Sequence, residues 1–239
     1  MAKSTKSPRS PNRLLASLRP TDFEVLRPHL KYVELVHEVV LYKTGDTIDR
    51  VYFPHSGIIS LVVDLTGGQM IEAAMIGRDS MPSGSSALDG LISLNRAIVQ
   101  LAGDAVTLDV ARLREVAHKS SAFRATLIRH EQALFAQAQQ SAACNASHTV
   151  EARLSRWLLR ARDLSGTDTL ALTQEFLGQM LGVQRSSVSL VANTLQQAGL
   201  ITYSRGRIEI VNLGGLQKAC CECYGTVKAH YARLVNNAS

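Results

Sequence analysis

The residues with the clearest chemistry lie between positions 184 and 189, where one arginine stands among short polar side chains. The guanidinium of Arg185 matches the O6 and N7 acceptors of guanine. Gln184 can pair with adenine or cap a helix, and Ser187 and Ser189 can donate hydrogen bonds to phosphate. Ser186 belongs to the same polar face. These residue types at this spacing favour binding to a nucleic acid.

The segment around them predicts two short helices joined by a turn. Thr173 is a suitable N-cap, and Glu175 follows it near the positive end of the first helix. Gly182 falls where the chain must turn, and the small Gly178 lets the two helices cross closely. Residues 173–200 therefore predict a helix-turn-helix whose second helix exposes its polar face.

A tight β-hairpin is predicted directly after this motif. Residues 201–203 and 207–211 are β-rich and flank Ser204-Arg205-Gly206, which reads as a wing. Arg205 and Arg207 can meet phosphates near its tip, the alternative being two solvated turn residues. The predicted DNA-binding residues are Thr173, Gln184, Arg185, Ser186, Ser187, Ser189, Arg205 and Arg207.

The first half of the chain predicts a small β-roll. After short helical patterns at residues 14–35, β-rich runs alternate with turn signals such as Gly45-Asp46 and Gly67-Gly68. These runs cover residues 36–42, 50–54, 58–64, 69–76, 97–101 and 105–108. The interior of such a roll is either filled by side chains or encloses one small ligand.

A long helix is predicted between the two halves, because residues 121–145 contain neither glycine nor proline. Apolar residues recur at intervals of seven, which favours pairing with a second copy of the helix. The alternative is a helix buried within a single chain. The predicted dimerisation residues are Leu127, Ile128, Leu134, Phe135 and Ala142.

Composition is that of an ordinary folded protein with a basic balance. The 239 residues include 26 lysines and arginines against 20 acids, a net charge of +6, which favours a polyanionic partner. No apolar run reaches the roughly 18 residues of a membrane span, and the basic N-terminus lacks the apolar core of a secretory signal. We therefore expect a cytoplasmic protein with no membrane partner. The predicted plan is a flexible basic arm (1–13), a β-roll sensor domain (14–115), a dimerisation helix (116–147) and a winged domain with an extra C-terminal helix (148–239).

Together these features resemble the Crp/Fnr family of bacterial transcription regulators. The resemblance rests on Lys43-Thr44-Gly45-Asp46, on residues 51–57 (VYFPHSG) and most strongly on residues 174–201. It implies an α+β fold with a jelly-roll-like, cyclic-nucleotide-binding-like β-roll, a dimerisation helix and a winged helix-turn-helix. It also implies a homodimer that binds a roughly palindromic site on double-stranded DNA and contacts RNA polymerase.

The sequence departs from the family where a cyclic nucleotide would bind. Arg78, Asp79 and Ser80 stand where nucleotide-binding members carry a Gly-Glu-Leu type segment, and Arg96 falls near the place of the phosphate arginine. These four residues are the candidate ligand pocket. The missing glutamate removes the ribose contact, so a cyclic nucleotide is disfavoured, and Arg96 is alternatively a surface or ion-paired residue. The effector, if there is one, is left open.

The reading helix also departs from the family pattern of an Arg, a Glu and a further Arg. Arg185 is kept, whereas the other two places read Ser186 and Leu190. Serine cannot accept a hydrogen bond from cytosine as a carboxylate does, and leucine cannot bond a base or a phosphate. The preferred DNA sequence should therefore differ.

The four cysteines begin at Cys144, so the N-terminal iron–sulfur cluster of oxygen-sensing members is unsupported. Cys220, Cys221 and Cys223 fall in a C-terminal helix predicted over residues 213–235, where small packing residues are the simplest interpretation. A metal or redox site with His230 is the alternative, but the spacing matches no strong zinc pattern. No metal ligand is predicted.

Two further classes of function are alternatives to a regulator. One is a small-molecule or thiol-redox sensing module whose winged domain binds protein rather than DNA, which would favour an apolar exposed face. The other is an enzyme, which is not predicted because the seven histidines are scattered and no paired carboxylate or nucleophile motif occurs. Activation and repression are equally compatible with the sequence.

Overall fold

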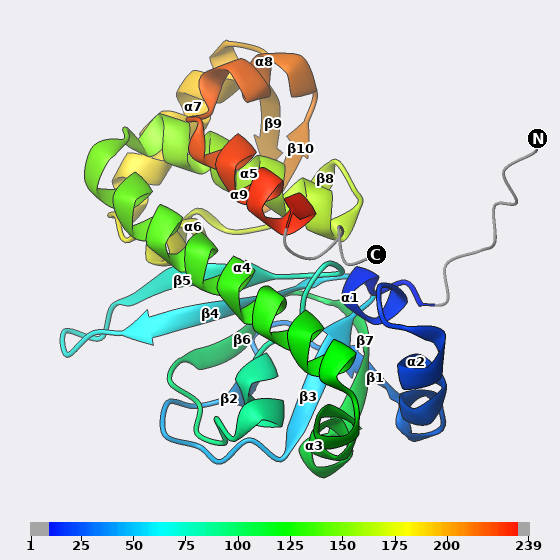
Figure 1. Cartoon of the computed structure of the whole chain (residues 1–239). Helices are drawn as coiled ribbons and strands as arrows, with labels where there is room; N and C mark the ends of the chain where they lie inside the picture. The colour runs from blue at the N-terminus through cyan, green and yellow to red at the C-terminus, as the bar shows by residue number, and fades with distance from the viewer. Residues whose placement is uncertain (1–9, 234–239) are drawn as a thin grey trace, which may run out of the picture.

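The computed structural model describes residues 10–233 of the chain. Its β-strands lie mainly in one half and its small helices in the other, and a long helix crosses between them (Figure 1). Residues 1–9 of the predicted basic arm and residues 234–239 of the predicted C-terminal helix lie outside the described part. Within that part, no helix combines the length and the apolarity needed to cross a membrane.

Two antiparallel sheets form the β-roll. One has the order β1-β7-β3 and the other the order β2-β6-β4-β5. Their bounds are β1 Lys31–Leu35, β2 Val40–Tyr42, β3 Arg50–Pro54, β4 Ile58–Asp64, β5 Met70–Ile76, β6 Arg96–Leu101 and β7 Gly103–Asp109. The short helices α1 (Arg13–Ala16) and α2 (Pro20–Leu26), with the 3-10 turns Arg27–His29 and Gly84–Leu88, complete this half.

The sheet containing β4 is covered on both faces. Ile59 and Leu61 point into the core of the roll, whereas Ile58 and Val62 pack in a second core with the helices of the other half. This explains why β4 carries apolar residues on both faces, with Ser60 as the one polar residue between Ile58 and Val63, since a strand buried on both faces has no solvent side.

Three helices follow the roll: α3 (Val110–Lys119), α4 (Ser121–Ser147) and α5 (Val150–Ser165). Ser120 separates the first two and caps α4, because its hydroxyl accepts a hydrogen bond from the Phe123 N–H at 3.1 Å. Thr149 caps α5 in the same way through the Ala152 N–H. At 27 residues, α4 is about 40 Å long, enough to connect both halves.

The second half is a winged helix-turn-helix with two further helices. It contains β8 (Thr169–Ala171), α6 (Gln174–Leu181), α7 (Arg185–Gln197), β9 (Ile201–Ser204), β10 (Arg207–Ile210), α8 (Leu213–Ala219) and α9 (Cys223–Tyr231). Its sheet has the order β8-β10-β9.

Two sequence predictions about elements are wrong. Residues 31–35 form the strand β1 rather than helix, because they pair with β7 along the edge of the roll. The single C-terminal helix is divided into α8 and α9, since Cys220 adopts an extended conformation and ends α8. The strand β8 was not predicted, and it gains its hydrogen-bonding partner only when β10 folds back beside it.

Candidate nucleic-acid interface

The helix-turn-helix is built as the sequence predicts. Thr173 caps α6 by accepting a hydrogen bond from the Phe176 N–H at 3.1 Å. Gly182 ends the helix with a φ of 63°, a left-handed conformation that glycine adopts without strain. The Val183 N–H then donates to the Gly178 carbonyl at 2.9 Å, which closes the turn.

Gly178 permits the close approach of the two helices. A Cβ at this position would lie 2.9 Å from the Val183 carbonyl oxygen, closer than side-chain carbons come to backbone. The helices share an apolar core that includes Leu177, Val188 and Leu195, all fully buried. This packing fixes α7 with its polar face outward.

The N-terminal turn of α7 is the exposed part of the predicted reading face. Gln184, Arg185 and Ser186 are exposed, and the Gln184 side chain makes no capping bond. Ser187 and Ser189 are half-buried, and the Ser189 hydroxyl donates to the Gln174 side chain, which joins α7 to α6. Arg185 is therefore the cationic side chain that leads the helix.

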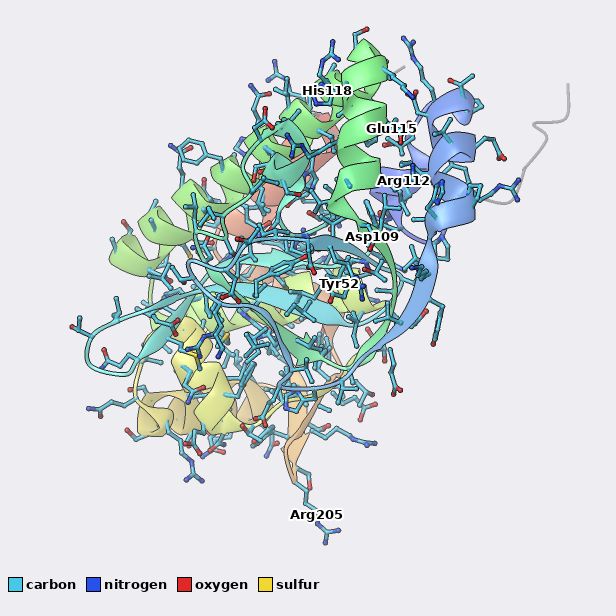
Figure 2. All side chains as sticks on the ribbon, turned by 90° about the horizontal axis from the view of Figure 1, so that it is seen from below. Tyr52, Asp109, Arg112, Glu115, His118 and Arg205 are labelled. Atoms are coloured by element: carbon cyan, nitrogen blue, oxygen red, sulfur yellow. The ribbon has the colours of Figure 1, made fainter. Side chains whose placement is uncertain are left out.

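The wing carries two exposed arginines. Arg207 pairs with Ser204 across the hairpin, and Arg205 and Gly206 between them have φ values of 48° and 73°. Figure 2 shows Arg205 projecting from the hairpin tip, well away from Arg112 on α3. The exposed side chains of Thr173, Arg205 and Arg207 add to the polar surface around α6 and α7.

The start of α7 also faces the β-roll. A groove of about 390 Å³ lies between the β4–β5 hairpin and the two helices, with Gly68, Ile71, Gly182 and Arg185 among its lining residues. The Ile71 side chain closely approaches Gly182. The roll therefore contacts the turn of the helix-turn-helix that leads into α7.

The four candidate pocket residues do not come together. Arg78, Asp79 and Ser80 follow β5 at one end of the sheet, whereas Arg96 begins β6 opposite Val62. Val62 also pairs with Glu72 of β5, and β5 runs about 13 Å farther to Ile76, so Arg78 lies beyond the far end of the strand from Arg96.

These residues instead hold other parts of the structure. Asp79 forms a buried ion pair with Arg160 of α5 at 2.8 Å, and Ser80 hydrogen-bonds the buried His130 of α4 at 2.6 Å. Arg78 donates to the Asp163 carbonyl at 3.0 Å. Arg96 pairs with Asp64 at 3.2 Å, which is the alternative role that the sequence left open.

The predicted dimerisation residues divide between two faces of α4. Leu127 is buried in the core of its own roll, and Leu134 packs partly against that core. Ile128, Phe135 and Ala142 are exposed, with 48% of Ile128 and 65% of Phe135 accessible. The exposed face keeps the seven-residue repeat.

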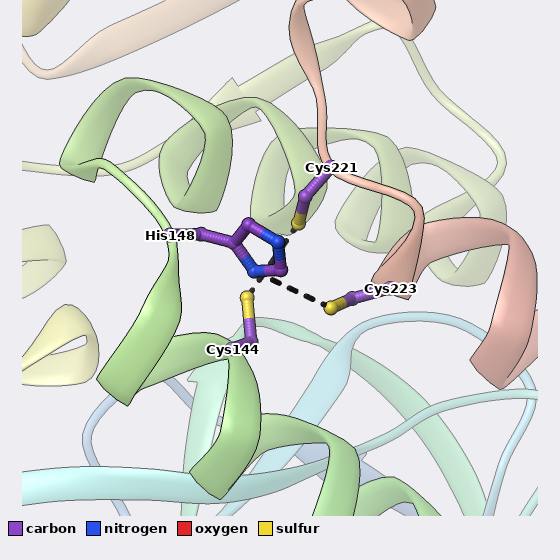
Figure 3. A group of neighbouring side chains, drawn as sticks. All are labelled: Cys144, His148, Cys221 and Cys223. Carbon is purple, nitrogen blue, oxygen red and sulfur yellow. Dashed lines mark hydrogen bonds between the residues drawn. The ribbon is translucent and has the colours of Figure 1, made fainter.

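The cysteines form a cluster that the sequence reasoning missed. Cys144, Cys221 and Cys223 are buried beside His148, and none of them is bonded in a disulfide (Figure 3). His230, which the sequence suggested as a partner, is not in this group. The available signal was the pair Cys144 and His148, which stand four residues apart at the end of α4.

The chain combines a β-roll, the long helix α4 and a winged helix-turn-helix, and this architecture can be compared with that of known proteins. Residues 152–219 match the family model of the Crp-like helix-turn-helix domain. A comparison with curated proteins gives no match.

Solved structures share the architecture of the chain. FixK2 from Bradyrhizobium japonicum has a TM-score of 0.68 and 16% identity, covering 80% of this chain and 98% of that one. The c-di-GMP responsive global regulator CLP from Xanthomonas campestris has a TM-score of 0.62 and 14% identity, covering 80% and 99%. A CRP/FNR family transcriptional regulator from Thermus thermophilus has a TM-score of 0.61 and 20% identity, covering 79% and 97%.

The predicted fold class and family resemblance are thus confirmed. The chain carries a Crp-like helix-turn-helix domain and has the fold of Crp/Fnr transcriptional regulators.

Proposed function

We propose that the protein is a sequence-specific DNA-binding transcription regulator that acts as a homodimer on a roughly palindromic site. The observation that carries the proposal is the exposed Arg185 at the first turn of α7, in the helix that such domains insert into the major groove. Contact with RNA polymerase and a place in the cytoplasm belong to the same proposal. The β-roll senses a signal that the chain does not identify, or none.

The wing supports DNA as the partner. Arg205 and Arg207 are exposed on the hairpin beside the helix-turn-helix, where they can reach the phosphate backbone. A winged domain that binds protein should instead expose an apolar patch. On α7 the exposed large apolar residue is Leu190, and its neighbours one helical turn away are polar (Ser186, Ser187, Asn193 and Thr194), so protein binding is the weaker candidate.

Arg185→Ala tests the reading role. A bidentate contact to guanine is worth about 1–3 kcal/mol, so we expect the variant to bind its specific site about 5- to 150-fold more weakly. It should also lose discrimination at one base pair in each half-site. The measurement is a fluorescence titration with the chain's own upstream DNA and with fragments selected from a random library.

Arg112→Ala is the matched control, because it removes one exposed arginine from α3, far from the proposed interface (Figure 2). It lowers the net charge by the same amount and should leave specific binding unchanged. An Arg185→Ala variant with the wild-type sequence preference, or a wild-type protein that binds no DNA, would contradict the proposal.

A further inference from the structure

Four side chains that can bind metal converge where the two halves of the chain meet. Cys144 lies in the last turns of α4 and His148 ends that helix, while Cys221 and Cys223 come from the junction of α8 and α9 (Figure 3). Each offers one ligand atom, and all four atoms lie within 4.8 Å of one another.

The distances fit ligands around a single ion. The Sγ atoms of Cys144 and Cys221 are 3.5 Å apart, and the Cys223 Sγ lies 3.6 Å from the His148 Nδ1. Tetrahedral zinc with bonds of about 2.3 Å places its sulfurs about 3.8 Å apart. A disulfide needs about 2.05 Å, and a cluster of several irons needs its thiolates farther apart, because each binds a different iron.

Neighbouring groups orient the ligands as a metal site requires. The His148 Nε2 lies 3.2 Å from the Glu222 carboxylate, which leaves Nδ1 directed toward the sulfurs. The Gln140 amide donates to the Cys223 sulfur at 3.0 Å. Carboxylate–histidine pairs and hydrogen bonds to ligand atoms of this kind hold metal ligands in place.

The charged side chains around the cluster suit an ion bound by three thiolates. Two arginines of α5, Arg153 and Arg156, lie within electrostatic reach of Cys144. One divalent ion with three thiolates leaves a single negative charge, which these arginines can balance.

We propose that Cys144, His148, Cys221 and Cys223 bind one Zn²⁺ ion. Three thiolates and one imidazole form the tetrahedral sulfur and nitrogen set that zinc prefers. All four positions are filled by protein, so the site is structural and leaves no place for a substrate. This site goes beyond the proposed function and does not depend on DNA binding.

The ion would join elements that belong to different halves. α4 packs on the β-roll, and α8 packs in the winged domain, whereas Val227 and Tyr231 of α9 are buried in the core of the roll. Zinc between α4 and the α8–α9 junction therefore fixes the path by which the chain returns from the wing to the roll. Loss of the ion should release α9 from α4 and weaken the packing of the winged domain against the roll.

The first test counts metal in the full chain. Protein purified without an affinity tag that binds metal, then treated with a mild chelator and analysed by inductively coupled plasma mass spectrometry, should hold about one zinc per chain. Reloading with Co²⁺ should give the intense absorption bands of tetrahedral cobalt with thiolate charge transfer. A wild-type chain with less than about a tenth of an equivalent of zinc and no such bands would overturn the proposal.

Cys220→Ser and Cys223→Ser form a matched pair of variants. Cys220 is the neighbouring cysteine, but its thiol bonds the Gln217 carbonyl and lies outside the cluster. Cys220→Ser should keep the wild-type metal content, and Cys223→Ser should lose at least tenfold in zinc affinity. Equal losses in both variants, or a Cys144–Cys221 disulfide in the intact mass of freshly purified wild type, would also refute the site. If Cys223→Ser does not fold, the wild-type zinc content and cobalt spectrum decide alone.

Discussion

Arg205 occupies a backbone position that an arginine rarely takes. Its φ of 48° is followed by 73° at Gly206, a pair of left-handed residues as in type I′ hairpin turns, which favour Asn-Gly. Arginine is less suited than asparagine to this conformation, since its long side chain gains no local hydrogen bond there. The chain accepts this cost at the tip of the wing, where the guanidinium projects into solvent.

Arg205→Asn removes the positive charge at the tip of the wing and keeps a residue that suits the turn conformation. Asparagine keeps the left-handed conformation, so the melting temperature should stay the same or rise slightly. Removal of the proposed phosphate contact should weaken DNA binding several-fold on every sequence and reduce the slope of log K against log salt by about one per wing. The measurement is a set of titrations across several salt concentrations.

Arg112→Asn serves as the comparison, because it removes a charge from the far side of the molecule. Its salt slope should equal that of the wild type. An unchanged slope in Arg205→Asn would mean that the wing arginine is a solvated turn residue.

For individual residues, the sequence could predict the features that depend on local spacing. The N-cap Thr173, the turn at Gly182 and the exposure of Arg185 follow from helical periodicity over a few residues. The cysteine cluster does not, because Cys144 and Cys221 are 77 positions apart and meet only after α9 returns to α4. A spacing rule for one continuous motif cannot detect a site assembled from two segments.

Between elements, the contact of β5 with α5 contains a buried carboxylate. The Trp157 indole donates to Glu72 at 3.0 Å, and the Ser60 hydroxyl donates to its other oxygen at 2.5 Å. Burial raises the pKa of Glu72, although these hydrogen bonds and the charges of Arg156 and Arg160 lower it in part. A raised pKa means that the folded protein holds the proton more tightly than the unfolded chain.

Glu72→Gln should therefore change how stability depends on pH. In the wild type, the free energy of unfolding should fall as the pH rises from the ordinary value of 4.5 through the raised pKa. Glutamine keeps an acceptor for Trp157 and does not ionise, so its melting temperature should vary less between about pH 5 and 8. Thermal unfolding across this range measures the difference.

Glu115→Gln is a control at a carboxyl whose pKa is shifted in the opposite direction. Hydrogen bonds from Lys119 and Arg112 lower the pKa of this exposed carboxyl on α3. The stability it contributes is present above its unfolded pKa and is lost only in acid, so this variant should follow the wild type above pH 5. The Glu72 assignment fails if Glu72→Gln retains the full wild-type slope.

Helices and strands could be predicted from the sequence where a local pattern of residues marks their ends. β3 and β4 begin and end where the sequence predicts, because turn residues bound both runs. β1 was missed because its burial is irregular and its partner, β7, is about 70 residues away. The break between α8 and α9 was also hidden, since residues 220–222 contain neither glycine nor proline.

At the scale of the whole molecule, the long helix α4 has an inner face that packs within its own chain and an outer face that exposes apolar side chains. Its inner face packs on the roll through Phe123, Leu127 and Ala133. Its outer face leaves Ile128 and Phe135 exposed at a spacing of seven, a pattern typical of a helix that pairs with a second copy. Two-fold pairing along this face would set two copies of α7 at a fixed separation, as a palindromic site requires.

Ile128→Glu combined with Phe135→Glu should convert the proposed dimer into a monomer. Burial of each side chain contributes about 1.5–3 kcal/mol, and two-fold symmetry counts each change twice. The dimer dissociation constant should therefore rise by at least 100-fold, as measured by analytical ultracentrifugation. DNA with two half-sites should then bind no more tightly than DNA with one, since the monomers no longer bind as a unit.

Tyr32→Glu is the control, because Tyr32 is 71% exposed on β1, whereas α4 packs against β5 of the other sheet. It adds a charge in place of a similarly exposed aromatic side chain and should leave the dimer intact. A double variant of α4 that still sediments as a dimer would place the two-fold contact elsewhere. It would also remove the reason for expecting a palindromic site with half-sites set by α4, because the spacing of the two reading helices would then follow from another interface.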